Sequence, residues 1–154
     1  MQISVYAVGR KMPAWVSQAS EDYIKRMPRR WQFQVREFAQ AQGDSKDVIM
    51  AREAEVLLAA IPDKAHVIAL DNRGRSWSTE QVAEQLERWQ ELGKSLILLI
   101  GGADGLHPSV RQRADQMWSL SDLTFPHPLV RVVLAEQLYR AQSLLDNHPY
   151  HRAG

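Results

Sequence analysis

The C-terminal segment gathers side chains that could recognise a nucleobase. Residues 146 to 152 read Asp-Asn-His-Pro-Tyr-His-Arg. Tyr150 and His151 could stack on and hydrogen-bond to an RNA base while Arg152 contacts phosphate. A frayed, exposed terminus is the alternative. Two histidines on either side of Pro-Tyr do not supply the three protein ligands that a metal site needs, so we expect no metal.

Charged side chains in two further places could take part in catalysis or binding. Glu136 and Arg140 are four residues apart, and an intrahelical ion pair explains them more simply than catalysis does. Basic residues near the first predicted helix could contact phosphates, although such charges more often form a solvated face. These basic residues are Arg10, Lys11, Lys25, Arg26, Arg29 and Arg30.

Two loops have compositions suited to holding a ligand. Gly101-Gly102-Ala103-Asp104-Gly105 could let a ligand approach the backbone closely, and a tight turn explains it equally well. It lacks the Gly-Lys-Ser/Thr ending of a Walker A loop. In residues 120–128, two prolines bracket His127, so this loop could present amide and carbonyl groups to an adenine edge, or form a rigid connection in which His127 caps or packs.

The elements that must position these residues alternate between strands and helices. Strands are predicted at 3–8, 32–38, 66–70, 96–100 and 117–120, and helices at 14–27, 47–60, 78–92 and 129–145. Ser78 and Gln81 form a capping-box pattern, and Gly93 is well placed to end that helix. We expect a mobile loop at 40–46 and a turn at 71–76. This order predicts an α/β fold with a mostly parallel sheet, whose ligands bind at loops 70–76, 101–106 and 120–128.

Composition narrows the class of protein further. The 154 residues are 45% apolar and 24% charged, with a formal net charge of +1 and no cysteine. Disulfides, thiolate metal sites and cysteine nucleophiles are therefore excluded. We see no signal peptide and no membrane-spanning run, and we expect one cytoplasmic domain spanning residues 1–154. The five tryptophans are expected to pack in the core or at interfaces rather than to stack on bases.

Long motifs of the chain closely resemble the RlmH family, bacterial methyltransferases of the SPOUT class that methylate N3 of a pseudouridine in 23S rRNA. The matching stretches are 99–106, 123–132, 136–141 and 147–151, together with Ala7-Val8-Gly9 and Lys11. The resemblance implies a SPOUT-type sheet flanked by helices, a C-terminal deep trefoil knot and a homodimer. It also implies S-adenosylmethionine (SAM) as the cofactor. The cofactor-binding residues implied are Leu70, Asp71, Gly101, Gly102, Ser121, Asp122, Leu123, Thr124, Phe125 and Pro126.

The resemblance also implies how substrate is handled. N3 of pseudouridine carries a proton at neutral pH, so a base or a local positive charge must help to remove it. The candidates for positioning or proton transfer are Glu136, Arg140, Tyr150, His151 and Arg152. The expected partners are a second copy of the chain, 23S rRNA and the assembled ribosome, with neither DNA nor a membrane. A knotted methyltransferase acting on tRNA and a non-catalytic ribosome-binding module are the alternatives.

Overall fold

The computed structural model describes residues 1–151 and contains one five-stranded parallel sheet in the order β2-β1-β4-β3-β5. The strands are β1 (Ile3–Val8), β2 (Gln34–Phe38), β3 (His66–Ser76), β4 (Leu96–Ile100) and β5 (Gln116–Ser119). The α-helices are α1 (Ala14–Arg26), α2 (Lys46–Ala60), α3 (Thr79–Leu92), α4 (Pro108–Arg113) and α5 (His127–Leu145), with 3-10 turns η1 (Arg29–Trp31) and η2 (Pro149–His151).

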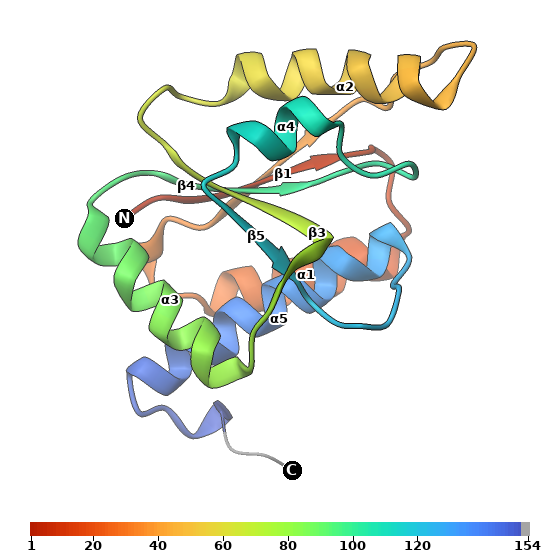
Figure 1. Ribbon diagram of the computed structural model, residues 1–154. Coiled ribbons are helices and arrows are strands. Elements are labelled where there is room, and N and C mark those ends of the chain that lie inside the picture. The colour runs from red at the N-terminus through yellow and green to blue at the C-terminus, as the bar shows by residue number, and fades with distance from the viewer. Residues whose placement is uncertain (152–154) are drawn as a thin grey trace.

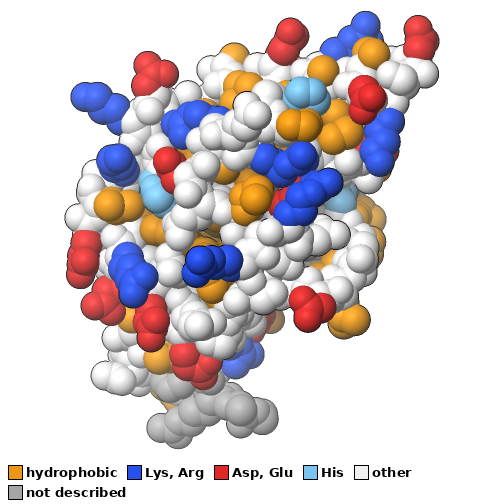
Figure 2. Space-filling view, viewed as in Figure 1, with side chains coloured by type: hydrophobic (Ala, Val, Ile, Leu, Met, Phe, Trp, Pro, Cys, Tyr) orange, Lys and Arg blue, Asp and Glu red, His pale blue; other side chains and the backbone are white. Residues whose placement is uncertain are grey.

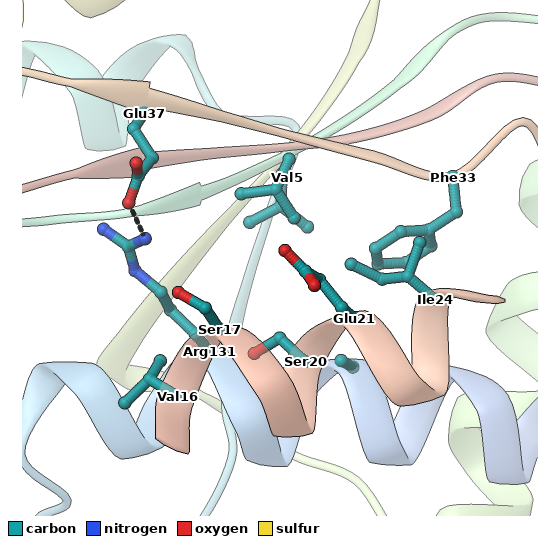
Figure 3. Close-up of a pocket in the computed structure, with 11 residues that line it drawn as sticks. Val5, Val16, Ser17, Ser20, Glu21, Ile24, Phe33, Glu37 and Arg131 are labelled. Carbon is teal, nitrogen blue, oxygen red and sulfur yellow. Dashed lines mark hydrogen bonds and ion pairs between the residues drawn. The ribbon is translucent and has the colours of Figure 1, made fainter. Parts of the chain in front are cut away.

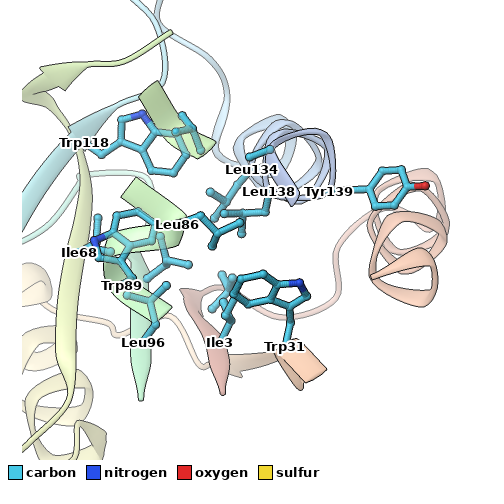
Figure 4. Packing of buried hydrophobic residues seen from close by; sticks show 14 of the residues in the cluster. Ile3, Trp31, Ile68, Leu86, Trp89, Leu96, Trp118, Leu134, Leu138 and Tyr139 are labelled. Carbon is cyan, nitrogen blue, oxygen red and sulfur yellow. The ribbon is translucent and has the colours of Figure 1, made fainter. Parts of the chain in front are cut away.

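Helices cover both faces of the sheet (Figure 1): α2 and α4 lie on one face, and α1, α3 and α5 on the other. Alternate residues of β4 supply the two cores, because successive side chains point to opposite faces. Leu98 packs into the cluster with Leu86 of α3 and Leu138 of α5, whereas Leu99 packs into the cluster with Leu57 of α2. Figure 4 shows the first cluster, in which α5 closes over the strands. The predicted α/β architecture with a parallel sheet is therefore confirmed.

Local sequence signals place several helix ends. Ser78 and Gln81 form a complete capping box at α3, and Gly93 ends that helix with a left-handed φ of 66°. Ser45 caps α2 by accepting a hydrogen bond from the Val48 amide. None of the helices within residues 1–151 is long and apolar enough to cross a membrane.

The turn predicted at 71–76 is wrong, because β3 continues to Ser76. Leu70 and Arg75 both register with Trp118 of β5, so residues 71–74 are extra residues in the pairing. Gly74 permits this contact: a Cβ there would lie 2.4 Å from the Met117 carbonyl carbon. β3 continues here because it pairs with a strand more than 40 residues later. Local turn propensity carries no information about such a distant partner.

Two further differences concern prolines. The sequence prediction missed α4, which begins with Pro108 after the N-cap His107. Helix α5 begins at His127 rather than 129, with Pro126 as its N-cap and Pro128 in its first turn. Proline suits a first helical turn because its missing N–H would have no intrahelical partner there.

Candidate functional site

Three loops meet at the carboxyl edge of the sheet. β3 lies between β4 and β5 and runs parallel to both, so the residues that follow Leu70, Ile100 and Ser119 emerge on the same side. Leu70 is half-buried, and the side chain of Asp71 is only 9% exposed. Asp71 accepts a 2.9 Å hydrogen bond from the Arg73 amide, which holds the start of the extra segment of β3. The structure thus brings the three predicted loops together.

The glycine loop after β4 is a tight turn. The amide of Gly105 donates a 3.0 Å hydrogen bond to the Gly102 carbonyl, and Gly105 has a φ of +85°. A Cβ on Gly101 would lie 2.7 Å from the Gly105 carbonyl carbon. Of the two interpretations of this loop, the turn is confirmed, and its contact with a ligand stays a prediction.

The first turns of helix α5 are tied to other chain segments at this edge. The Nδ1 atom of His127 lies 3.1 Å from the Gly101 carbonyl oxygen, which ties the first turn of α5 to the glycine loop. Burial lowers the pKa of His127, and the positive charge of Arg131 lowers it further. Both effects favour the neutral imidazole, which packs between α5 and the glycine loop.

Arg131, one turn after His127 on α5, also ties this helix to the sheet. Its guanidinium donates to the Gly9 carbonyl oxygen at 2.7 Å and pairs with Glu37 of β2. Figure 3 shows this pair at one end of a hollow of about 210 Å³ between α1, β2 and α5. Arg131 therefore fixes the ends of β1 and β2 relative to α5. The helical pattern of α5 does not reveal these two long-range partners.

The loop between β5 and α5 is open and partly apolar. The Ser119 hydroxyl donates to the Ser121 carbonyl at 3.0 Å, and the Ser121 hydroxyl accepts from the Leu123 amide at 3.0 Å. Leu123 is 72% exposed. Asp122, Thr124 and Pro126 are exposed, while Phe125 is half-buried. The loop therefore offers apolar surface and exposed backbone at the same edge.

Glu53, a buried acid that the sequence prediction did not include, packs against the glycine loop. Glu53 of α2 is only 7% exposed, and its Oε2 atom accepts a 3.0 Å hydrogen bond from the Ala41 amide. A Cβ on Gly102 would lie 3.3 Å from the Glu53 Oε1 atom and 3.2 Å from Val8. Burial raises the pKa of Glu53, and Asp104 raises it further, against the effect of the Ala41 hydrogen bond. Within the helical pattern of α2, only its neighbours in space distinguish Glu53 from an exposed glutamate.

The structure brings three of the predicted catalytic residues together, from the middle of α5 to the segment just beyond it. The Glu136 Oε1 atom accepts hydrogen bonds from Arg140 Nε at 2.7 Å and from the Tyr150 hydroxyl at 3.2 Å. Gln137 donates to the other carboxylate oxygen at 2.7 Å. The Arg140 guanidinium carbon lies 4.9 Å from the Tyr150 ring centroid. We call Glu136, Arg140 and Tyr150 the tail cluster.

The surroundings of Tyr150 and Arg140 in the tail cluster favour the protonated forms of both side chains. Burial raises the pKa of Tyr150, and the neighbouring Tyr23 and Glu136 raise it further. Burial lowers the pKa of Arg140, but Glu136 reverses that effect, so the net pKa is raised. Tyr150 is therefore a neutral hydrogen-bond donor and Arg140 a cation. For His151 the side chain lies outside what the structure describes, and Arg152 lies outside the described residues altogether.

The tail cluster and the contact between α5 and the glycine loop lie at different positions along α5. His127 meets the loop, and Glu136 is nine residues further along the same helix, which is about 13 Å of helix rise. In Figure 1 the C-terminal segment lies beyond the end of α5 that is farther from the loops. Within one chain the structure therefore does not join these two groups of predicted site residues.

The composition of the three loops suits an organic ligand. A Cβ on Gly102 would meet Val8 and Glu53, so this position packs against the protein interior, whereas Leu123 and the neighbouring residues of the loop before α5 are exposed. Such a combination suits a ligand with an apolar body and a few polar groups. Throughout residues 1–151, no group of three His, Asp or Glu side chains could hold a metal ion.

Comparisons with known proteins agree with this architecture. A family model described as "Predicted SPOUT methyltransferase" matches residues 1–151. The ribosomal RNA large subunit methyltransferase H of Methylococcus capsulatus is 49% identical, covering 99% of this chain and all of that protein. Proteins of the same name from Hahella chejuensis and Burkholderia ambifaria are 48% and 47% identical over 99% of this chain, covering 99% and 100% of their own lengths respectively.

A solved structure extends the comparison to the fold. A protein from Neisseria gonorrhoeae, described as belonging to a methylase family, superimposes with a TM-score of 0.56 at 12% identity, covering 95% of this chain and 93% of that one. At this identity the likeness concerns the fold alone. The whole-chain family match and the near-half identity to full-length relatives show that the chain belongs to the SPOUT methyltransferase family.

Proposed function

We propose that the chain transfers a methyl group from SAM to N3 of a pseudouridine in 23S rRNA of the assembled ribosome. The observation that carries this proposal is the near-half identity, over 99% of the chain, to relatives named ribosomal RNA large subunit methyltransferase H. The motif resemblance to pseudouridine N3-methyltransferases supports the choice of nucleotide and atom. Cytoplasmic location follows from a ribosomal substrate.

The three loops at the carboxyl edge are the proposed cofactor site. Bound SAM supplies an electrophilic methyl group on its sulfonium sulfur. Gly101 and Gly102 keep the glycine loop compact, since any side chain there would meet the loop backbone, Val8 or Glu53, and we propose that this compact loop leaves room for the ligand. Leu123 offers apolar surface, and Leu70 and Asp71 would border the cofactor from β3. Ser121 to Pro126 would hold the adenine and methionine portions through backbone groups.

The tail cluster is the proposed substrate-handling group. Methyl transfer needs the nucleophilic nitrogen held in line with the methyl carbon, so positioning supplies much of the acceleration. The Arg140 cation would favour the anionic form of the pseudouridine imide, whose N3 proton would pass to solvent water before the nitrogen attacks the methyl carbon. Glu136 already accepts hydrogen bonds from Arg140, Tyr150 and Gln137. Glu136 is therefore a positioning residue, which leaves Arg140 and the Tyr150 hydroxyl to meet the substrate.

A homodimer is proposed because one chain separates the tail cluster from the cofactor loops. About 13 Å of α5 lies between His127 and Glu136, which exceeds the hydrogen-bonding and methyl-transfer distances that catalysis requires. A second copy can place its own tail cluster against the loops of the first. The trefoil knot implied by the resemblance stays a prediction.

The test is transfer of labelled methyl from SAM to purified ribosomes that lack the modification, with free 23S rRNA and tRNA as parallel substrates. We expect label in ribosomes alone, at N3 of one pseudouridine. Label in tRNA instead would identify a knotted tRNA methyltransferase. Ribosome binding without label on any substrate would identify a non-catalytic binding module.

A further inference from the structure

A basic groove lies along β3, β5 and α3, outside the three loops and the tail cluster. Its volume is about 630 Å³. Figure 2 views this side of the molecule: Lys and Arg side chains lie over its middle, while acidic side chains gather mainly at its margins. The residues that define the groove are Arg73, Arg75, Trp77, Gln85, Arg88 and Gln116.

The arginines of the groove are available for a ligand. Arg75 and Arg88 are exposed, and within residues 1–151 neither side chain forms a hydrogen bond or an ion pair. Arg73 is 66% exposed and only loosely paired with Asp71, at 3.4 Å. By contrast, two arginines near α1 are already paired, Arg26 with Asp22 and Arg30 with Asp146. Unpaired guanidinium groups suit phosphate oxygens, which they can bind through two hydrogen bonds.

The floor of the groove is held rigid by hydrogen bonds. The Gln116 Oε1 atom accepts from Trp89 Nε1 at 2.7 Å and lies 2.8 Å from the His66 ring. Its amide nitrogen donates to Gln85 Oε1 at 3.0 Å. The NH₂ group of Gln85 has no partner within the described chain, and it can donate to a base edge or a phosphate.

An aromatic surface lies beside these polar groups. Trp77 is half-buried, and its ring centroid lies 5.2 Å from that of Trp118 and 6.0 Å from that of Trp89. Trp89 and Trp118 are buried, as expected of packing residues. They hold Trp77 in place while part of its surface lines the groove. A rigid, partly exposed indole beside free arginines is the combination that binds single-stranded nucleic acid.

The acid in the groove does not cancel its positive charge. Asp115 is the acidic residue of the lining. Its carboxylate accepts a 2.8 Å hydrogen bond from the Val67 amide and lies 3.6 Å from Arg113 and 3.7 Å from His66. Asp115 is therefore balanced by Arg113, which leaves Arg73, Arg75 and Arg88 as the remaining charged residues of the lining.

We propose that the basic groove binds a single-stranded stretch of ribosomal RNA adjacent to the nucleotide that is modified. This inference rests on the proposed function for the identity of the RNA. Arg73 and Arg75 lie two and four residues after Asp71 on β3, so at about 3.3 Å per residue they are at most about 13 Å of chain from the proposed cofactor site. Arg75 and Arg88 contact phosphates, the Gln85 amide donates to the strand, and a base lies on Trp77.

Photo-crosslinking tests the contact without any methyl transfer. The chain has no cysteine, so Arg88→Cys introduces a unique site for a benzophenone-maleimide label. Lys46→Cys is the matched control, because Lys46 is exposed at the start of α2 on the opposite face of the sheet. With ribosomes, we expect at least several-fold more cross-linking to 23S rRNA from position 88 than from position 46. Cross-linking only to ribosomal protein, or equal cross-linking from both positions, would overturn the proposal.

Charge removal gives a second, quantitative readout. At physiological salt, we expect Arg75→Gln/Arg88→Gln to raise the Kd for ribosomes about 10-fold and to reduce the slope of log Kd against log salt by about 1.4, since each lost phosphate contact removes roughly 0.7 for single strands. Lys46→Gln should change neither quantity, and the Kd for SAM should stay the same in all variants. An unchanged ribosome Kd and slope would overturn the groove assignment even if methylation is confirmed. Groove-dependent RNA binding by a chain that never methylates would overturn the proposed function alone.

Discussion

The guanidinium of Arg131 donates a 2.7 Å hydrogen bond to the carbonyl oxygen of Gly9, 122 residues earlier in the chain, and also pairs with Glu37. Three segments distant in sequence, the ends of β1 and β2 and the first turns of α5, therefore share one buried cation. Since α5 also contacts the glycine loop through His127, this cation helps to set the position of the proposed cofactor site.

Arg131→Met should destabilise the fold by about 2–3 kcal/mol, because it leaves the Gly9 carbonyl and Glu37 without their partner. The Glu37 side chain is 39% exposed and recovers some hydration, which keeps the effect at the low end for a buried pair. Urea unfolding followed by circular dichroism measures the change. Arg26→Met, which removes the exposed partner of Asp22, should cost less than about 0.5 kcal/mol. Equal losses in the two variants would contradict the role assigned to Arg131.

The pH dependence of stability should report on His127. Its pKa is lower in the folded chain than the ordinary value of 6.5, so folding favours the neutral imidazole. The contribution of His127 is complete above pH 6.5 and is lost as the pH falls through the lowered folded-state pKa. Unfolding free energies measured between pH 7.5 and about 5 should fall less steeply in His127→Gln than in the unmodified chain. An unchanged slope in His127→Gln would contradict the assignment.

Gly101→Ala should weaken SAM binding at least about 10-fold, because the new Cβ would lie 2.7 Å from the Gly105 carbonyl carbon and the loop would have to move. Isothermal titration calorimetry measures the affinity. Gly93→Ala is the control: Gly93 has left-handed φ at the end of α3 and open space around it, so alanine there should cost about 1 kcal/mol of stability without changing SAM affinity. If Gly101→Ala binds SAM normally, the glycine loop does not contact the cofactor.

Glu53→Gln should be as stable as the unmodified chain at pH 7, or more stable. Glutamine can still accept the Ala41 hydrogen bond but no longer buries a charge. Because folding raises the pKa of Glu53 above 4.5, the penalty exists above the folded-state pKa and disappears as the pH falls below 4.5. The stability difference between the two proteins should therefore shrink on acidification. Glu53→Leu, which removes the acceptor, should lose the anchor of Ala41; if it matches Glu53→Gln, the hydrogen bond contributes nothing.

Cross-protomer catalysis should be visible by complementation. Arg140→Gln should lower kcat about 100-fold or more with SAM affinity unchanged, as expected when a charge acting on the transition state is removed. Refolding it together with Gly101→Ala forms mixed dimers in which one of two sites combines intact loops with an intact tail cluster. Random mixing should then restore about a quarter of the full activity. Activity no greater than that of the two variants measured separately would show that each site is built from a single chain.

Local sequence patterns determined much of the architecture. The capping box at Ser78 and the glycine at 93 have direct local causes, since each satisfies backbone groups at a helix end. The apolar run of β4 requires cover on both faces, which the structure confirms. Alternation of strands and helices was enough to place the three loops at one edge, because the carboxyl ends of parallel strands coincide.

Only the tertiary structure decided which residues meet across the chain. β3 extends past Leu70 because Gly74 allows it to approach Met117, and Glu53 and Arg131 become buried because Gly102 and Gly9 lie against them. The basic groove joins Arg75 and Arg88 from two different elements. Contacts of this kind are fixed by packing between segments far apart in sequence, whereas helix caps and strand periodicity depend on neighbours within a few residues.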